Sequence, residues 1–122
     1  MEKLYESKII EIGVMAEEFL KEDTMVIFND SAPPELRDIC FVHEKTELID
    51  RIKVGDWLTI GDERYRIHLV GDTANETIRD LGHATLKFDG ASSSDLPGHI
   101  CVDVKPAPVI KPGTSIIFSR NK

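Results

Sequence analysis

Residues 57–70 read Trp-Leu-Thr-Ile-Gly-Asp-Glu-Arg-Tyr-Arg-Ile-His-Leu-Val, and this stretch indicates the fold class. Two strand-like segments, 57–60 and 64–70, flank the connection Gly61-Asp62-Glu63. A three-residue connection that contains glycine, placed between two such segments, is typical of a β-hairpin. The sequence therefore predicts two antiparallel strands here.

The same pattern extends outward from the hairpin in both directions. Glycine and proline divide the chain at short intervals, and the segments between them are rich in Val, Ile, Thr, Phe and Tyr, which suit a half-buried pleated surface. In the first strand Ile10, Ile12 and Val14 alternate with Glu11 and Gly13, which predicts one apolar face. Strands are expected at about residues 5–14, 24–28, 39–43, 57–60, 64–70, 84–88, 100–104 and 115–118.

Helical signals are few. Residues 15–21 favour a short helix or turn by intrinsic propensity. Thr73-Ala74-Asn75-Glu76 matches a capping box and Gly82 is placed to end a helix, so a helix over 74–81 is predicted. The double proline at 33–34 forbids a continuing ladder, and a loop is expected there.

Many short strands with turns at close spacing favour a closed barrel or a sandwich, because both shield sheet edges. We predict a mostly-β chain: a small β-barrel of about seven or eight short strands with one or two short helices. A length of 122 residues suits one ordinary domain, so residues 1–122 are expected to form a single unit.

Charge and composition exclude several classes of function. Fifteen Lys and Arg against 22 Asp and Glu give a net charge of -7, without the basic patch that nucleic acid requires. Apolar runs fall far below the roughly 20 residues that cross a bilayer, and no secretory signal is evident, so a cytoplasmic protein without direct membrane insertion is expected. Gly-x-Gly-x-x-Gly, Walker-type and Gly-x-Ser-x-Gly motifs are absent from the sequence.

Four histidines and two cysteines are the candidates for chemistry. Cys40-x-x-His43 and His99-x-Cys101 have the residue types of a zinc site. Strand residues three apart point to opposite faces, however, which argues against Cys40 and His43 sharing one ion. Both cysteines are interpreted as small, reduced, buried residues, and the zinc hypothesis stays open as an alternative.

His43 differs from the other histidines because it ends an apolar strand and polar residues follow it. We expect its ring to be half anchored and half exposed. A neutral imidazole is available near pH 7, and one ring nitrogen can attack while the other donates a hydrogen bond. A structural or surface histidine is the commoner reading of such a position and is kept beside the reactive one.

A set of short segments carries a family resemblance. The most distinctive is Leu-Gly-His-Ala-Thr-Leu-Lys-Phe-Asp-Gly at residues 81–90. It is accompanied by Cys-Phe-Val-His at 40–43, Glu47-Leu48, Pro97-Gly98 and Pro112-Gly113. With these segments the whole chain resembles the IIA components of the glucitol/sorbitol-type sugar phosphotransferase system (PTS).

The resemblance implies a phosphoryl relay. In it, His43 is the residue that accepts phosphate from the phosphocarrier HPr and passes it to a cysteine of the IIB domain, in a permease built of IIB and IIC components. His83 is a second candidate, as an assisting residue. Lys45 stands where some relatives have a second histidine, and it is a candidate to offer positive charge to the phosphoryl group. No cofactor and no metal are implied.

Two other readings of the chain remain at this stage. The first is a non-catalytic β-barrel that serves as a regulatory or binding module, and the second is the zinc-binding protein described above. An exposed edge strand would also allow two copies to pair as a homodimer. The polyol is not encoded in this chain, because the permease recognises the sugar.

Overall fold

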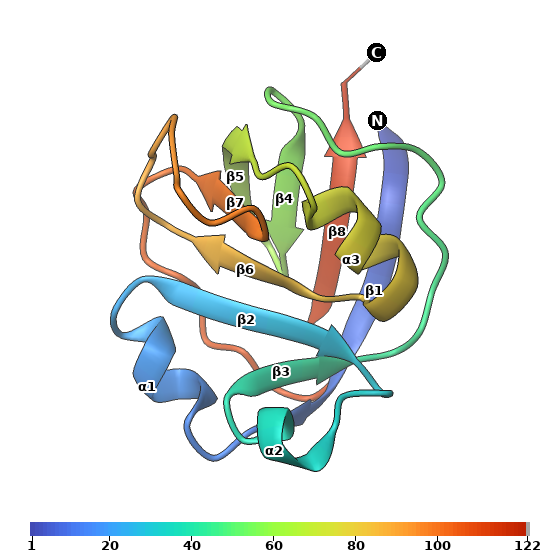
Figure 1. Cartoon of the computed structure of the whole chain (residues 1–122), viewed down its shortest axis with the longest axis vertical. Coiled ribbons are helices and arrows are strands. Elements are labelled where there is room, and N and C mark those ends of the chain that lie inside the picture. Colours follow the sequence, from blue (N-terminus) through green and yellow to red (C-terminus); the bar gives the residue numbers. More distant parts are fainter. Residues whose placement is uncertain (122) are drawn as a thin grey trace.

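Strands dominate residues 1–121, the part of the chain that a computed structural model describes (Figure 1). The strands are β1 (Glu2–Ile12), β2 (Thr24–Asn29), β3 (Cys40–His43), β4 (Trp57–Ile60), β5 (Glu63–Val70), β6 (Ala84–Lys87), β7 (His99–Val102) and β8 (Ser115–Arg120). The helices are α1 (Ala16–Leu20), α2 (Pro34–Arg37) and α3 (Ala74–Leu81). The mostly-β prediction is confirmed, including the 57–70 hairpin. The connection of that hairpin is shorter than predicted, because Glu63 already pairs with Ile60 and leaves only Gly61 and Asp62 between the strands.

The described strands close into a barrel in the order β1-β3-β2-β6-β7-β5-β4-β8. The pairs β2–β3 and β6–β7 are parallel, and the other neighbouring pairs are antiparallel. Figure 1 shows β2, β3 and β6 running across the near side, with β1, β4 and β8 rising steeply behind them. Closure leaves residues 1–121 without the free edge strand on which pairing of two copies would depend.

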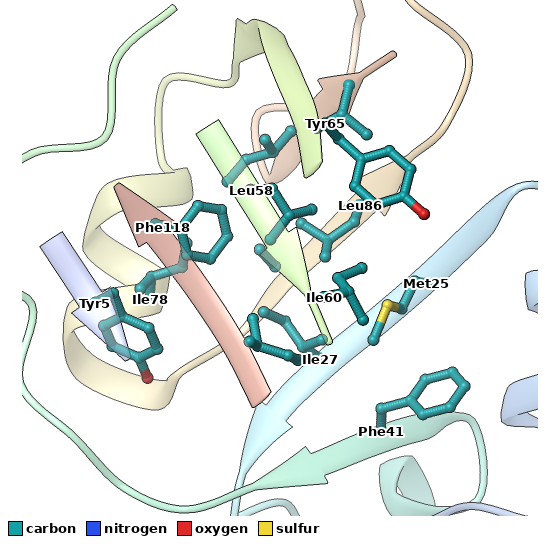
Figure 2. Packing of buried hydrophobic residues seen from close by; sticks show 14 of the residues in the cluster. Tyr5, Met25, Ile27, Phe41, Leu58, Ile60, Tyr65, Ile78, Leu86 and Phe118 are labelled. Atoms are coloured by element: carbon teal, nitrogen blue, oxygen red, sulfur yellow. The ribbon is translucent and has the colours of Figure 1, made fainter. Parts of the chain in front are cut away.

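Apolar side chains fill the barrel and exclude water from it. Aromatic rings pack against each other there: Tyr5 and its partner Phe118 on the paired strand β8 have ring centroids 6.3 Å apart, and the centroids of Tyr65 and Phe88 are 5.0 Å apart. Figure 2 shows part of this packing, and its labelled members include Tyr5, Met25, Ile27, Phe41, Leu58, Ile60, Tyr65, Ile78, Leu86 and Phe118. A well-packed core of this kind fixes the strand ends that carry the polar residues described below.

The inward face of β1 differs from the prediction. Tyr5, Ser7 and Ile9 are buried, whereas Ile10 is 44% exposed. The pairing with β3 shifts register between Ile9 and Glu11, so the alternation does not run unbroken along the strand. The strand also ends at Ile12, so Val14 lies in the following turn, 83% exposed. Ser7 therefore shares the inward face with Tyr5 and Ile9, between the exposed Glu6 and Lys8.

The double proline begins a helix, whereas the sequence analysis predicted only a loop. Pro33 is extended, with φ -65° and ψ 151°, and Pro34 occupies the first turn of α2. Proline is tolerated there because the first amides of a helix have no intrahelical partner. The outer face of β3 is buried by α2, because Leu36 packs with Cys40 and Val42.

The α3 helix has its predicted bounds, but the predicted capping box is wrong. Thr73 has φ -105° and ψ -2° and makes no capping hydrogen bond through its side chain. An N-cap residue normally has extended backbone, which aims its hydroxyl at the first turn. The C-terminal prediction is confirmed, since Gly82 ends the helix in the left-handed region with φ 59°.

Candidate functional site

His43 is the last residue of β3 and is only 1% exposed, so the expectation of a half-exposed ring is wrong. Strand alternation separates its neighbours. Cys40 and Val42 lie under α2, whereas Phe41 belongs to the cluster inside the barrel. Because residues two apart share a face, the ring of His43 lies on the same side as Phe41. It caps one end of the apolar interior.

Both nitrogens of the His43 ring have partners. Nδ1 lies 3.0 Å from Oγ of Ser7 on β1 and 2.9 Å from the carbonyl oxygen of Glu44, the residue that follows His43. Nε2 lies 2.7 Å from the carbonyl oxygen of Gly82 at the end of α3. The edge of the ring faces Tyr5, with centroids 5.9 Å apart and planes at 83°. Three separate parts of the chain thus fix one imidazole.

Gly82 is required at this site for two reasons. Its φ of 59° lies in the left-handed region, which residues with a side chain rarely adopt. A Cβ added at Gly82 would also lie 2.7 Å from Cε1 and 2.9 Å from Nε2 of His43. The absence of a side chain therefore lets the C-terminus of α3 approach the ring closely enough for its carbonyl oxygen to bond Nε2.

The protonation of His43 is set by opposing effects. Burial lowers the pKa of His43, while the carbonyl oxygens of Gly82 and Glu44 and the charge of Asp30 act to raise it. Burial has the larger effect, so the pKa lies below its ordinary value of 6.5. Near neutral pH the ring is therefore uncharged and one of its nitrogens carries a lone pair, as a nucleophile requires.

His83 lies near this site but does not touch the ring of His43 in the described residues. Its Nδ1 donates to the carbonyl oxygen of Ile27 at 3.0 Å, and its ring packs on Phe28 with centroids 4.6 Å apart. The strands next to the two histidines do not pair with each other, because β2 lies between β3 and β6. His83 is connected to the His43 ring through the backbone, because it directly follows Gly82, whose carbonyl oxygen bonds Nε2.

Lys45 lies at the rim of the site. Its Nζ is 3.7 Å from Oδ1 of Asp30, and the two side chains are 65% and 47% exposed. Asp30 follows Asn29, which pairs with His43 in the register of β2 and β3. An exposed pair of this kind contributes little to stability, so the ammonium group is free to exchange partners.

The residues of the zinc hypothesis are not brought together. Cys40 lies on β3 and Cys101 on β7, with two strands between them, and within residues 1–121 no three His, Cys, Asp or Glu side chains form a cluster that would hold a metal. Burial raises the pKa of each thiol to about 11. The prediction that both cysteines are buried and unpaired with each other is confirmed, and their raised pKa disfavours the reactive thiolate.

The groups that hold the His43 ring were missed by the sequence analysis. Two of the three are backbone carbonyls, which leave no trace in residue types. Ser7 had a local signal: Glu6 and Lys8 on either side of it are charged and exposed, so strand alternation turns the serine inward.

Comparisons with known proteins identify the family and agree with the fold. A family model described as the PTS system glucitol/sorbitol-specific IIA component matches residues 4–117. The chain belongs to this family. It is 33% identical over 122 residues to the glucitol/sorbitol-specific EIIA components of Shigella flexneri and of Escherichia coli strain K12, covering 100% of this chain and 99% of each relative.

A solved structure agrees with the family assignment. The crystal structure of a PTS system IIA component from Enterococcus faecalis V583 superimposes with a TM-score of 0.87 at 26% identity, over 95% of this chain and 100% of that one. This glucitol/sorbitol-type IIA chain is thus a phosphocarrier in sugar uptake and a phosphotransferase component of the PTS. The non-catalytic and zinc-binding readings are not favoured.

The helices of this IIA component are short. Within residues 1–121 none is long and apolar enough to cross a bilayer, and α3, the longest, has 8 residues.

Proposed function

We propose that His43 carries the phosphoryl group and that its Nε2 is the nitrogen that accepts it. The observation that carries the proposal is the difference between the two ring nitrogens. Nδ1 has two partners, one on β1 and one in the backbone directly after β3, whereas Nε2 has the single carbonyl of Gly82. Moving one peptide group uncovers Nε2, while uncovering Nδ1 requires two strands to separate.

Access to Nε2 depends on Gly82, since the ring is buried at rest. A glycine crosses between backbone regions that are closed to other residues, so the Gly82–His83 peptide is able to turn its carbonyl away from the ring. On this proposal His83 positions that peptide, because the hydrogen bond from Nδ1 of His83 to the carbonyl oxygen of Ile27 anchors the residue after Gly82 to β2. Its role is then indirect, without contact with the phosphoryl group.

The transfer itself needs little covalent machinery. The lone pair of Nε2 forms the new N–P bond as the P–N bond of the donor phosphohistidine breaks in line, and the donor ring leaves as neutral imidazole. The proton on Nδ1 stays in place, and the positive charge on the ring is stabilised by the carbonyl oxygen of Glu44, 2.9 Å away. Lys45 at the rim supplies positive charge to the phosphoryl oxygens.

The partners follow from the family. We infer that HPr is the donor and that the IIB cysteine of a glucitol/sorbitol permease, with its IIC component, is the acceptor side of the relay, in the cytoplasm. Residues 1–122 act as one IIA unit. The net charge of -7 favours encounter with a donor that presents a basic surface, and association is then fast and salt-sensitive.

The proposal is tested with radiolabelled phospho-HPr. Wild-type protein is expected to take up one acid-labile phosphoryl group, and His43→Gln to take up none. His99→Gln is the matched control, because His99 lies on β7, with two strands between it and β3, and we expect it to label like the wild type.

The site of attachment is read separately by NMR of the phosphorylated, ¹⁵N-labelled protein, from the coupling between phosphorus and ring nitrogen. Coupling to Nε2 is expected. Normal labelling of His43→Gln would place the acceptor elsewhere, and coupling to Nδ1 would overturn the choice of nitrogen.

A further inference from the structure

Ser7 is the one side chain in residues 1–121 that hydrogen-bonds the His43 ring. It lies on β1, is 4% exposed and is brought to the ring by the pairing of β1 with β3. Its Oγ lies 3.0 Å from Nδ1 and 2.8 Å from the carbonyl oxygen of Glu44. The hydroxyl hydrogen thus has two acceptors within reach and can point to only one of them at a time.

The other groups around the ring are less adaptable. The carbonyl oxygens of Gly82 and Glu44 only accept hydrogen bonds, so both favour a protonated nitrogen opposite them. The Asp30 carboxylate after β2, paired with Lys45, acts in the same direction. Tyr5 on β1 makes a T-shaped ring contact with His43 and adds no charge, since burial raises the pKa of its phenol to about 12.

A neutral ring has one N–H and cannot satisfy both carbonyls. We place that hydrogen on Nε2 in the resting protein, because the only partner of Nε2 within residues 1–121 is an acceptor, the Gly82 carbonyl, whereas Nδ1 also has a hydroxyl that can donate to it. Nδ1 then presents a lone pair, and Ser7 is the group that donates to it. When the hydrogen sits on Nδ1 instead, Nδ1 donates to Glu44 and to Oγ, and the serine hydroxyl donates to the Glu44 carbonyl.

We propose that Ser7 is a positioning residue for phosphoryl transfer: its hydroxyl turns between Nδ1 of His43 and the Glu44 carbonyl, which keeps the ring neutral and lets its one proton occupy either nitrogen. This inference rests on the proposed role of His43. Before attack, the proton on Nε2 passes to water as the Gly82 carbonyl turns away. The Ser7 hydroxyl gives its proton to Nδ1, takes one from water in exchange, and then points its hydrogen at the Glu44 carbonyl. The ring then attacks through the bare Nε2.

Ser7→Ala removes the donor to Nδ1, and its effect is measured first on the unphosphorylated protein. The ¹⁵N shifts of the His43 ring report where its proton lies. We expect wild type to hold the proton on Nε2, and the Ala variant to move the ratio of the two tautomers by roughly threefold to tenfold toward Nδ1. The ring should also become easier to protonate, because a hydrogen bond to the neutral form is lost.

The second readout is the pH profile of transfer from phospho-HPr. As the pH is lowered, the protonated ring loses the lone pair that attacks phosphorus, and transfer stops. We expect transfer to Ser7→Ala to stop at a higher pH than transfer to the wild type. Ser7→Thr keeps the hydroxyl and is expected to restore both the tautomer and the profile. Ser119→Ala is the control, because Ser119 is an equally buried serine on β8 that makes no contact with the ring.

Each outcome decides the matter. A shift in Ser7→Ala that Ser7→Thr reverses supports the proposal. An unchanged tautomer and profile in Ser7→Ala overturns it, and so does an equal shift in Ser119→Ala. The tautomer measurement needs no phosphate, so a failure of Ser7 is distinguishable from a failure of His43→Gln to abolish labelling.

Discussion

Replacing Gly82 with alanine tests whether the approach of α3 to His43 holds the site together. The change adds strain, because Gly82 has φ 59°, and this costs roughly 1 kcal/mol for a residue with a side chain. It also adds a methyl group 2.7 Å from Cε1 of His43 and 2.9 Å from the Cβ of Asn29. Overpacking of this kind costs roughly 1–3 kcal/mol. The expected loss of unfolding free energy is therefore roughly 2–4 kcal/mol.

Gly61 provides a matched control in the same chain. It lies in the β4–β5 hairpin with φ 58°, and a Cβ added there would meet only Cγ2 of Thr114 at 3.8 Å, an ordinary contact. Gly61→Ala therefore carries the strain without the clash, and we expect a loss of roughly 1 kcal/mol. The difference between the two variants isolates the contact with His43 and Asn29.

Urea unfolding followed by the fluorescence of Trp57, the one tryptophan of the chain, measures both losses. Phosphoryl transfer from phospho-HPr, measured where both variants are folded, should be slowed in Gly82→Ala and unchanged in Gly61→Ala. Equal losses of unfolding free energy in the two variants would refute the reasoning, because the close approach of Gly82 to the ring would then cost nothing to disturb.

Three further predictions concern the same end of the barrel. Because the pKa of His43 is lowered in the folded protein, the unfolded chain takes up a proton near pH 6.5 while the folded ring stays neutral, so the free energy of unfolding falls as the pH drops below about 7, until the folded pKa is passed. In urea unfolding at several pH values, His43→Gln should show a smaller fall than the wild type. An equal fall in both proteins would show that His43 does not cause it. His83→Gln should slow phosphoryl transfer from HPr without abolishing stoichiometric labelling, and an unchanged rate would exclude His83 from the site. Asn75 on α3 bonds the backbone N–H and C=O of Ile52 at 2.7 and 2.9 Å, so Asn75→Ala should cost roughly 2–4 kcal/mol by urea unfolding, against almost nothing for the exposed Glu76→Ala, and similar losses would contradict this role.

The strands and turns were predictable because their signals are local. Gly61 marks the hairpin within a few residues of both strands, and Gly82 marks the end of α3 in the same way. The capping box of α3 was mispredicted for the opposite reason, although the helix bounds were predicted correctly. The backbone N–H of Thr73 bonds the carbonyl of Pro97, far along the chain, and Thr73 has a backbone conformation that does not suit a cap.

The candidate site was predictable only in part. His43 was correctly placed at a strand end, but its burial depends on groups distant in sequence: Ser7 is 36 residues before it and Gly82 is 39 residues after it. The closed barrel and the residue without a side chain at position 82 bring these groups together. Neither the closure of the barrel nor the close approach of Gly82 can be deduced from the sequence of the strand that carries His43.

The pairing of the first strand with the last has a consequence for how the chain folds. Glu2 lies opposite Arg120, so the seam between β1 and β8 joins the two ends of the described chain (Figure 1). Contacts between residues so far apart in sequence slow folding, because a long loop must close before they form. A circular permutant that links the two ends and opens the exposed Ser92–Ser93 bond would turn this seam into a hairpin. It should fold faster to the same barrel, with the imidazole unchanged.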